Sequence, residues 1–321
     1  MDKQTCITEE NSVRDVMTDW TSVLKANPIP QLLEHDELGL VNRVSRDLLD
    51  SAKGGLEEPV CEDITYKTLA RKQKPDGSWR ESGSKKNEEV WTFIASLRSL
   101  YQLLDLGADM SDEFFAHGAH FIAGTQTADG DFRGAYGANI PAPDYTGMVL
   151  DVLLRGGFDD ETVIDRAFAW LLDVRRAKGG WAIPVLRSKS KKDPSSHNVT
   201  GMVLRGFAGD TQKRHKEEAD KAAAFLADSI FKPDAYPDRR SIEYWGKIAY
   251  PFWFTDALSA TDVLTRLGYG LSFGRVSRAY EWLLRQQGDD GFWSCSLNRR
   301  DRTPDPWLTY AALRTIKSLA H

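Results

Sequence analysis

The stretch RQQGDDGFWSC, residues 285–295, places a glutamine, a glycine and a tryptophan at fixed offsets, as Gln287, Gly291 and Trp293. The same offsets occur three more times, at Gln73, Gly77 and Trp79, at Gln126, Gly130 and Phe132, and at Arg175, Gly179 and Trp181. A degenerate fifth copy, Ile230, Asp234 and Tyr236, keeps only the aromatic residue. An aliphatic residue four positions before each first member completes a pattern that is typical of a helix end followed by a turn.

A threonine recurs downstream of each turn with even more regular spacing. The five threonines are separated by 54, 54, 55 and 54 residues, and each begins an apolar helical run: Thr92, Thr146, Thr200, Thr255 and Thr309. One more period before Thr92 falls on Leu38, inside another amphipathic segment. The period of about 54 residues therefore predicts six units, each made of a helix, a glycine turn, a loop and a second helix.

The expected fold is all-α, a single domain over residues 1–321 that forms an (α/α)6 toroid of six helical hairpins. The unit at 11–50 is the most divergent, and regular repeats cover 60–321. An open solenoid is the alternative, but neither end shows an atypical polar capping repeat. We expect first helices near 11–25, 61–73, 111–126, 161–177, 215–230 and 274–287. Second helices, rich in small residues as suits an inner ring, are expected near 36–50, 88–104, 144–156, 197–209, 252–267 and 306–320.

Composition limits the class of protein. The chain has 321 residues, 41% hydrophobic content, a formal net charge of -5 and only three cysteines. These values favour a folded protein in a reducing compartment and argue against nucleic acid as the main partner. The N-terminus has no basic start or apolar run, and no stretch approaches the roughly 20 apolar residues of a membrane span. We therefore expect a cytoplasmic protein without a transmembrane segment; peripheral membrane contact and the oligomeric state stay open.

The repeated aromatic-Leu-x3-Gln-x3-Gly-x-Trp pattern resembles the QW motif of squalene-hopene and oxidosqualene cyclases, which the β subunits of protein prenyltransferases share more loosely. The resemblance covers roughly residues 60–320 and implies a terpenoid cyclase-like toroid. In that family the motif is structural, with the glutamine capping a helix end against the tryptophan. It thus implies structural roles for four aromatic residues: Trp79, Phe132, Trp181 and Trp293.

Candidate ligand-binding residues cluster in sequence around the starts of the second helices. Large aromatic side chains flank the repeated threonines and would line a central cavity if the ring closes: Trp91, Tyr145, Trp253, Phe254, Trp307 and Tyr310. Core packing is the alternative for each of them. The loops just before these helices are basic in an otherwise acidic chain, as at Arg299, Arg300 and Arg302, and would form a positive mouth for an anion.

Candidate acids lie at the same level: Asp144, Asp256 and Asp305, with His197 as a further acid–base candidate. Helix N-capping is the alternative role for Asp144 and Asp305. The cyclases' Asp-x-Asp-Asp motif is absent. The prenyltransferases' zinc-binding Asp-x-x-His-Thr stretch corresponds to Asp305-Pro306-Trp307-Leu308-Thr309, and leucine is no zinc ligand. We therefore expect neither a metal nor a cofactor.

These features favour a protein that binds a hydrophobic isoprenoid, most readily a prenyl diphosphate, with its chain among aromatic side chains. If it is catalytic, Asp256 or Asp144 would protonate an alkene or epoxide. Two alternatives remain: a non-catalytic binding module on the same toroid, and a carbohydrate-active (α/α)6 enzyme acting on acidic sugars with His197, Tyr145 or an Asp pair.

Overall fold

The structure is a computed structural model that describes residues 20–49, 60–80, 87–137, 139–183, 194–237, 240–296 and 303–320. Within these ranges it contains twelve α-helices and no β-strand. The all-helical prediction is confirmed. Helices of two sets alternate along the chain. The first set consists of α2 (Ile29–Leu33), α4 (Ile64–Lys72), α6 (Glu113–Gly124), α8 (Glu161–Val174), α10 (Lys216–Ser229) and α12 (Val276–Gln286). The second set consists of α3 (Leu38–Leu48), α5 (Glu88–Leu106), α7 (Pro143–Arg155), α9 (His197–Gly209), α11 (Ala257–Arg266) and α13 (Pro306–Ala320).

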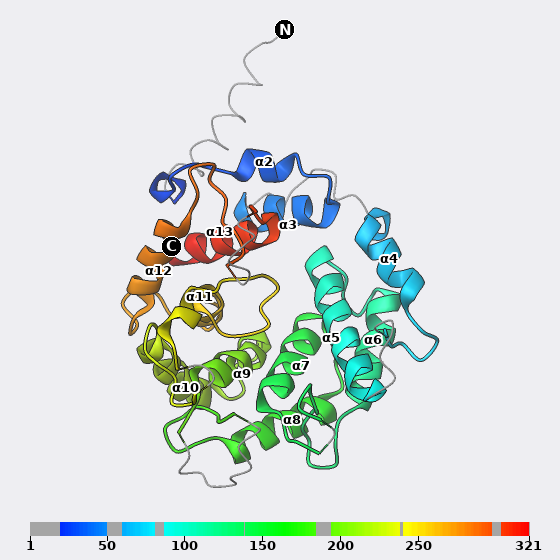
Figure 1. The fold of residues 1–321 in the computed structure, drawn as a ribbon. Coiled ribbons are helices and arrows are strands. Elements are labelled where there is room, and N and C mark those ends of the chain that lie inside the picture. Colours follow the sequence, from blue (N-terminus) through cyan, green and yellow to red (C-terminus); the bar gives the residue numbers. More distant parts are fainter. Residues whose placement is uncertain are drawn as a thin grey trace.

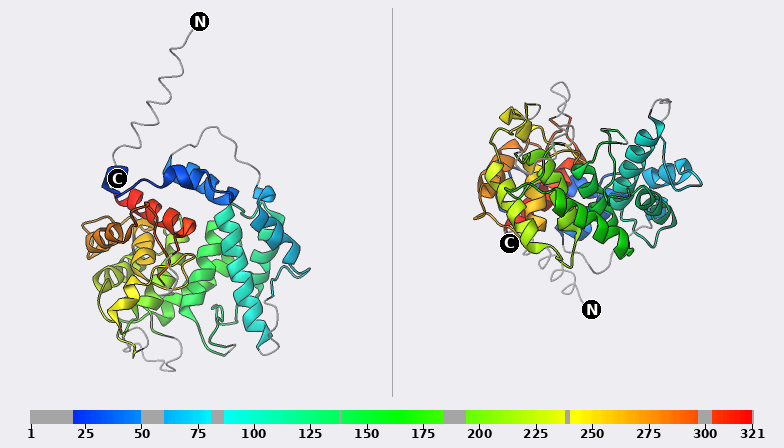
Figure 2. Two further views of the ribbon diagram at one scale, coloured as in Figure 1. Left: turned by 45° about the horizontal axis from the view of Figure 1, so that its top comes forward. Right: turned by 90° about the horizontal axis from the view of Figure 1, so that it is seen from below.

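The second set of helices forms a closed ring. Contacts run from α3 to α5, α7, α9, α11 and α13 in turn, and α13 contacts α3 again. Figure 1 shows these helices around a common centre, with α4, α6, α8, α10 and α12 outside them, and Figure 2 shows the same ring from other sides. The ring is consistent with an α/α toroid, whereas its division into six hairpins stays a prediction. No helix of the described residues is long and apolar enough to cross a membrane.

Two helix boundaries differ from the prediction. Of the first helix expected at 11–25, residues 11–19 lie outside the described residues, and a short 3-10 turn occupies Thr21–Val23. The described part of that range, residues 20–25, is not α-helical; the short helix α2 follows, with a proline in its first turn, the helical position that tolerates one. Helix α11 begins at Ala257 rather than near 252, because Asp256 and Ser259 form a reciprocal capping box.

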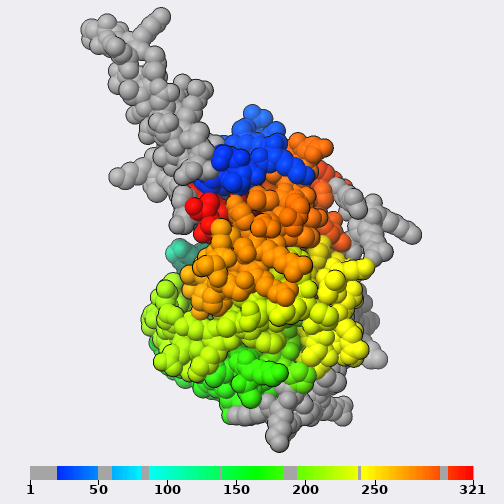
Figure 3. All heavy atoms as spheres, turned by 90° about the vertical axis from the view of Figure 1, so that its left-hand side faces the viewer, coloured from blue at the N-terminus to red at the C-terminus, as the bar shows by residue number. Residues whose placement is uncertain are grey.

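Contacts between the two ends of the described chain close the ring. The Gln287 side-chain amide donates to the Ala26 carbonyl at 2.8 Å, and the Lys25 backbone N–H donates to Gln287 Oε1 at 2.7 Å. Trp307 Nε1 donates to Glu37 Oε2 at 2.9 Å. In Figure 3 the N-terminal helices, in blue, lie directly on the C-terminal segments, in orange and red. The first and last units therefore pack together as neighbours.

Each complete glutamine turn makes the same two hydrogen bonds. Gln73 Nε2 donates to the carbonyl of Gly77 in its own turn (3.1 Å) and to that of Phe114 in the next outer helix (2.8 Å). Gln126 repeats this pattern with Gly130 and Val163, at 3.0 and 2.9 Å. Gly77 has φ +83°, and a Cβ there would lie 2.3 Å from a backbone oxygen of α6. The motif thus links each unit to the following one and requires glycine at its turn.

The repeated threonine fixes the aromatic end of the same turn. The hydroxyls of Thr146, Thr200 and Thr309 accept the backbone N–H of Phe132, Trp181 and Trp293 at 3.0, 3.1 and 3.0 Å. In the second unit Ser96 takes over this role for Trp79 at 3.0 Å. In the fifth unit Thr255 instead donates to the Asn198 carbonyl at 2.6 Å. In the third, fourth and sixth units the regular threonine spacing therefore reflects a hydrogen bond between the turn and the next inner helix.

Replacing Gln287 by alanine is expected to lower the free energy of unfolding by about 1–3 kcal/mol, since the Ala26 and Gly291 carbonyls lose a buried donor. Urea denaturation measures the loss. The neighbouring Gln286 is exposed, and Gln286→Ala serves as the matched control with an expected change within about 0.5 kcal/mol. Equal losses in both variants would contradict a role of Gln287 in ring closure.

Candidate functional site

Polar side chains from five inner helices meet at the centre of the ring. We call them the axial cluster: Tyr101 and Asp105 of α5, Asp151 and Arg155 of α7, Arg205 of α9, Asp262 and Arg266 of α11, Arg314 of α13, and Tyr250 from the segment before α11. Most of these residues lie in the middle or C-terminal part of their helices. The centre of the ring is therefore ionic on this side.

Asp151 is the hub of the axial cluster. Its fully buried carboxylate lies 2.7 Å from Arg266, 3.3 Å from Arg205 and 3.6 Å from Arg155. The Tyr101 hydroxyl donates to it at 3.1 Å. Burial alone would raise its pKa, but the three guanidinium groups hold the pKa below the ordinary value for aspartate. Asp151 therefore stays ionised at neutral pH.

The pKa values of the other two carboxylates of the cluster are shifted in opposite directions. Asp262 accepts from Arg314 at 2.5 Å; burial opposes ionisation, but Arg314 and Arg266 still lower its pKa. Asp105 accepts from the Tyr250 hydroxyl at 2.6 Å, and burial raises its pKa despite the nearby Arg155. Asp105 is thus the carboxylate of the cluster that most readily becomes neutral.

The axial cluster carries more positive than negative charge. Its four arginines, Arg155, Arg205, Arg266 and Arg314, face three aspartates, which leaves a surplus of one positive charge when all are ionised. Arg155 and Arg266 are the last residues of α7 and α11, where the negative ends of the helix dipoles offset part of this charge. Burial would lower the pKa of Arg155, but Asp151 and Asp105 raise it above the usual value, so the guanidinium stays charged.

The segment from Tyr250 to Trp253 fills the centre of the ring next to the cluster. The Arg205 guanidinium donates to the Phe252 carbonyl and lies between the rings of Tyr101 and Phe252, at 4.9 and 5.7 Å from their centroids. Figure 1 shows this segment, in yellow before α11, turning into the ring. The cavity left beside the cluster is only about 10 Å³.

The six predicted aromatic residues lie in different surroundings. Trp253 packs edge-on against Tyr101 with centroids 6.0 Å apart, and Trp307 stacks on Tyr250 at 6.0 Å, so both adjoin the axial cluster. Tyr145 contacts Phe93 and Tyr136 instead. Trp91 is 37% exposed, and Phe254 is half-buried.

Tyr310 is buried and donates its hydroxyl to Asp47, and the Arg314 guanidinium lies 5.5 Å from its ring centroid. Trp253, Trp307 and Tyr310 thus adjoin the cluster. They contact Tyr101, Tyr250 and Arg314 respectively.

The predicted acids are not brought together, and two of them cap helices. Asp256 Oδ1 accepts the Ser259 backbone N–H at 2.8 Å, and burial raises its pKa to about 7. Asp305 accepts the Leu308 backbone N–H at 3.0 Å, and burial raises its pKa.

Asp144 differs from the two capping aspartates in having one carboxylate oxygen without a partner. Its Oδ2 accepts from Tyr136 at 2.6 Å, whereas its buried Oδ1 has no hydrogen-bond partner, and burial raises its pKa to about 6.

His197 Nδ1 lies 3.2 Å from Asp234, and its ring stacks on Trp245 at 4.4 Å. His197 therefore packs within the degenerate fifth turn, away from the axial cluster.

Three predicted residues, Arg299, Arg300 and Arg302, lie outside the described residues. In the part of the chain that is described, no group of three or more His, Cys, Asp or Glu side chains is placed to hold a metal ion.

The charged residues of the axial cluster were not predicted from the sequence, although a pattern in the repeat indicates three of them. Asp151, Arg205 and Arg314 each lie five positions after a repeated threonine, Thr146, Thr200 and Thr309. This position is apolar in the other two units, Leu97 and Ala260. A charge at an inward, otherwise apolar position of a repeat indicates residues that meet at the axis.

Comparison with known proteins gives limited information. No family model matches the chain, and no curated protein matches it. Two similar solved structures are a protein from Actinoplanes, at 15% identity over 94% of this chain and 90% of that one, and Candida albicans protein geranylgeranyltransferase-I complexed with GGPP, at 16% identity over 95% and 90%. Both have a TM-score of 0.48, a likeness that carries no argument about function.

The buried Asp256 predicts a specific pH dependence. Its folded-state pKa of about 7 lies above the value of about 3.9 expected for an unfolded chain, so between these values the native state binds more protons. Its contribution to stability is therefore present at low pH and is lost as the pH rises through about 7.

We expect Asp256→Asn, which keeps a capping acceptor, to flatten the fall in stability between about pH 4 and 7. Urea denaturation across this range measures the slope, and the exposed Asp109→Asn is the control. An unchanged slope in Asp256→Asn would show that this carboxyl does not titrate there.

Proposed function

We propose that the protein is an (α/α)6 toroid that binds an anionic isoprenoid, of the prenyl diphosphate class, on the ring axis. The anionic head would contact the arginines of the axial cluster, and the apolar chain would contact the aromatic residues toward the N-terminal ends of the inner helices. The observation that carries the proposal is the surplus of arginine charge, buried at Arg205 and mostly buried at the other three, at the centre of the ring.

Buried charge without a full set of partners is costly, and a bound anion removes this cost. Among the described residues, the ion pair that Arg155 forms is the long one with Asp151, at 3.6 Å, and the cavity beside the cluster is lined by all four arginines. Guanidinium groups hold phosphate oxygens in paired hydrogen bonds. The cluster therefore suits a phosphate or diphosphate head better than a neutral ligand.

The apolar part of the ligand has a surface to contact. Along α5, Phe93 and Tyr101 come before Asp105, and they contact Tyr145 and Trp253 respectively. Trp307 extends this surface on the other side through Tyr250. Each CH₂ buried there would contribute about 0.8 kcal/mol. A gradient from aromatic to ionic along the axis matches an amphiphile.

Binding requires the segment Tyr250–Trp253 to move, because the present cavity of about 10 Å³ is far too small for a prenyl chain. The contacts to be exchanged are those of the Tyr250 hydroxyl with Asp105 and of the Phe252 carbonyl with Arg205. A phosphate oxygen would replace the carbonyl as the acceptor for Arg205. After this exchange, the N–H group of Arg205 that now donates to the Phe252 carbonyl still has an acceptor.

We expect geranylgeranyl diphosphate to raise the unfolding temperature more than geranyl diphosphate does, and both more than inorganic diphosphate. At 100 times the dissociation constant, the gain is about 2.7 kcal/mol. Arg155→Met should reduce the protection by all three, and Trp253→Ala should reduce the dependence on chain length. The triple change of Arg299, Arg300 and Arg302 to Gln tests the alternative head site in the predicted basic mouth. Each variant is compared with its own unliganded state.

Three outcomes would overturn the proposal. Protection by oligouronates and not by prenyl diphosphates would favour the acidic-sugar enzyme. Protection by no anion would leave the arginines as a structural ion-pair network in a binding module of another kind. Protection that Arg155→Met preserves and the triple change removes would move the head to the loops at the opposite end of the inner helices.

A further inference from the structure

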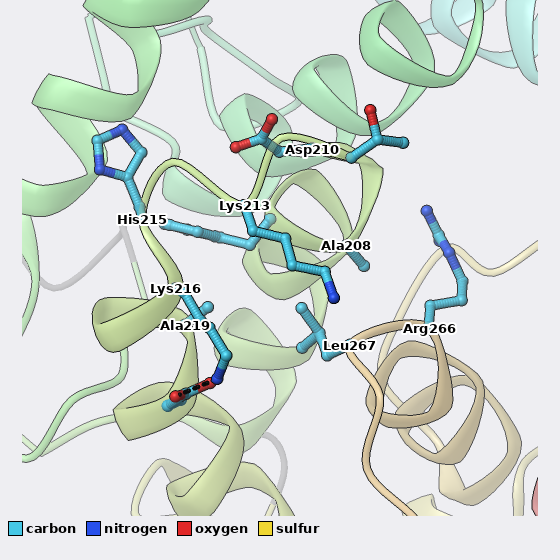
Figure 4. A pocket seen from close by; sticks show the side chains of 11 residues that line it. Ala208, Asp210, Lys213, His215, Lys216, Ala219, Arg266 and Leu267 are labelled. Atoms are coloured by element: carbon cyan, nitrogen blue, oxygen red, sulfur yellow. Dashed lines mark hydrogen bonds and ion pairs between the residues drawn. The ribbon is translucent and has the colours of Figure 1, made fainter.

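A larger cavity, of about 240 Å³, lies away from the ring axis, between the end of α9, the start of α10 and the end of α11 (Figure 4). Apolar side chains and basic side chains both line it. The apolar ones are Phe207, Ala208, Ala219 and Leu267, and the basic ones are Lys213, Lys216 and Arg266, with His215, Asp210, Asp220 and Thr211 completing the lining.

The two carboxylates of this pocket are already engaged by neighbours. Asp210 Oδ2 accepts the Arg214 backbone N–H at 2.9 Å, and its other oxygen lies 3.4 Å from the Arg214 guanidinium. Asp220 pairs with Lys216 at 2.6 Å and accepts the Tyr269 hydroxyl. Lys216 thus offsets Asp220, whereas Arg214 is shared among Asp210, Glu161 and Asp165 and offsets Asp210 only in part.

Two cations remain available to a ligand. Among the described residues, Lys213 forms no ion pair with a carboxylate. Arg266 lies at the opposite wall and shares Asp151 with two other arginines. Figure 4 shows Lys213 extending across the cavity toward Leu267, with Arg266 beyond it. Positive charge thus faces the cavity from both sides.

The backbone at Lys213 has an unusual conformation. Its φ is +53°, in the left-handed region that glycine and asparagine adopt most readily. A lysine backbone in this left-handed conformation is strained, and strain of this kind occurs often at binding sites. The strain directs a charged side chain over the cavity, and a glycine would make the same turn without it.

We propose that this pocket binds a small organic anion, a phosphate or carboxylate joined to an apolar body about the size of one ring. An apolar cavity of about 150 Å³ takes up benzene, so 240 Å³ accommodates a ring together with its anionic group. The ring lies on Phe207 and Leu267, and the anionic group lies between Lys213 and Arg266. The site is separate from the axial cluster and shares only Arg266 with it.

The test uses phenyl phosphate as the probe, titrated into the full-length protein by calorimetry, with benzyl alcohol as the uncharged comparison. We expect saturable binding of phenyl phosphate and binding of benzyl alcohol at least about tenfold weaker. Lys213→Gln should weaken phenyl phosphate binding about tenfold, whereas Lys72→Gln, at an exposed position on α4, should change it less than about twofold.

Lys213→Gly separates binding from folding, because it removes the charge and the backbone strain together. We expect it to lose binding while its unfolding temperature stays equal or rises. The proposal is overturned if phenyl phosphate does not bind the wild-type protein, or if Lys213→Gln binds as the wild type does. Loss of binding in Arg155→Met with Lys213→Gln unaffected would assign the anion to the axial cluster and likewise overturn it.

Discussion

Replacing Asp151 by alanine is expected to lower the free energy of unfolding by about 3–5 kcal/mol, because it leaves buried guanidinium groups without their counter-charge. Arg266, Arg205 and Arg155 all lie within 3.6 Å of this carboxylate. The Tyr101 hydroxyl also loses its acceptor in Asp151 and keeps only the Met148 carbonyl at 2.9 Å. Urea denaturation at neutral pH measures the loss.

The effect of Asp151→Ala should also depend on pH in a defined direction. The folded-state pKa of Asp151 is lowered, so its stabilising contribution is present above the unfolded value of about 3.9 and is lost as the pH falls below it. The difference between wild type and variant should therefore shrink in acid.

A matched control separates burial from pairing. Asp165 pairs with Arg214 at 3.3 Å, the same distance as Asp151 from Arg205, but its side chain is 65% exposed. Asp165→Ala should cost at most about 1 kcal/mol. If Asp151→Ala costs no more than Asp165→Ala, the arginines of the cluster do not depend on Asp151 in the folded state.

The repeat itself predicted most of the helices. Eleven of the twelve expected helices correspond to α3 to α13, with a shifted start for α11, because a regular period constrains every unit at once. The turn glycines and threonines stand at fixed offsets, since each makes a backbone contact that its unit needs. In the first unit the described residues 20–25 contain only a 3-10 turn at Thr21–Val23, and the short helix α2 begins at Ile29.

The candidate site was harder to predict, because its residues are far apart in the sequence. Tyr250 and Asp105 are hydrogen-bonded although 145 positions separate them. Sequence spacing places Trp253 at a helix start, but it does not show that the preceding loop turns into the ring and brings Phe252 onto Arg205. A loop's path depends on tertiary contacts that no local pattern encodes.

Acidic residues at helix starts illustrate the same limit. Asp256 and Asp305 have the sequence positions of capping residues, and the structure places their oxygens on backbone N–H groups. Asp144 has a similar position but bonds Tyr136 and keeps one buried oxygen unpartnered. All three are aspartates close to the start of an inner helix, so only the surroundings distinguish the two that cap from Asp144, whose second oxygen has no partner.

Replacing Trp293 by alanine is expected to cost about 3–5 kcal/mol, as a large-to-small change in a fully buried position. The indole packs in a cluster with Trp20, Ile29 and Leu40 of the first unit, so the cavity would form where the ring closes. Its Nε1 also donates to the Leu283 carbonyl at 2.9 Å, which would be left without a donor. Thermal and urea denaturation measure the loss.

Two further variants make the Trp293 result specific. Trp293→Phe should cost only about 1–2 kcal/mol, since the third unit places Phe132 at the same point of its turn and the main loss is one hydrogen bond. Trp91→Ala removes an indole that is 37% exposed and should change stability by about 1 kcal/mol or less. Because Trp293 packs between neighbouring units and the proposed ligand site lies on the ring axis, folded Trp293→Ala is expected to keep the protection by geranylgeranyl diphosphate. A stably folded Trp293→Ala that has lost this protection would instead make Trp293 part of the binding site.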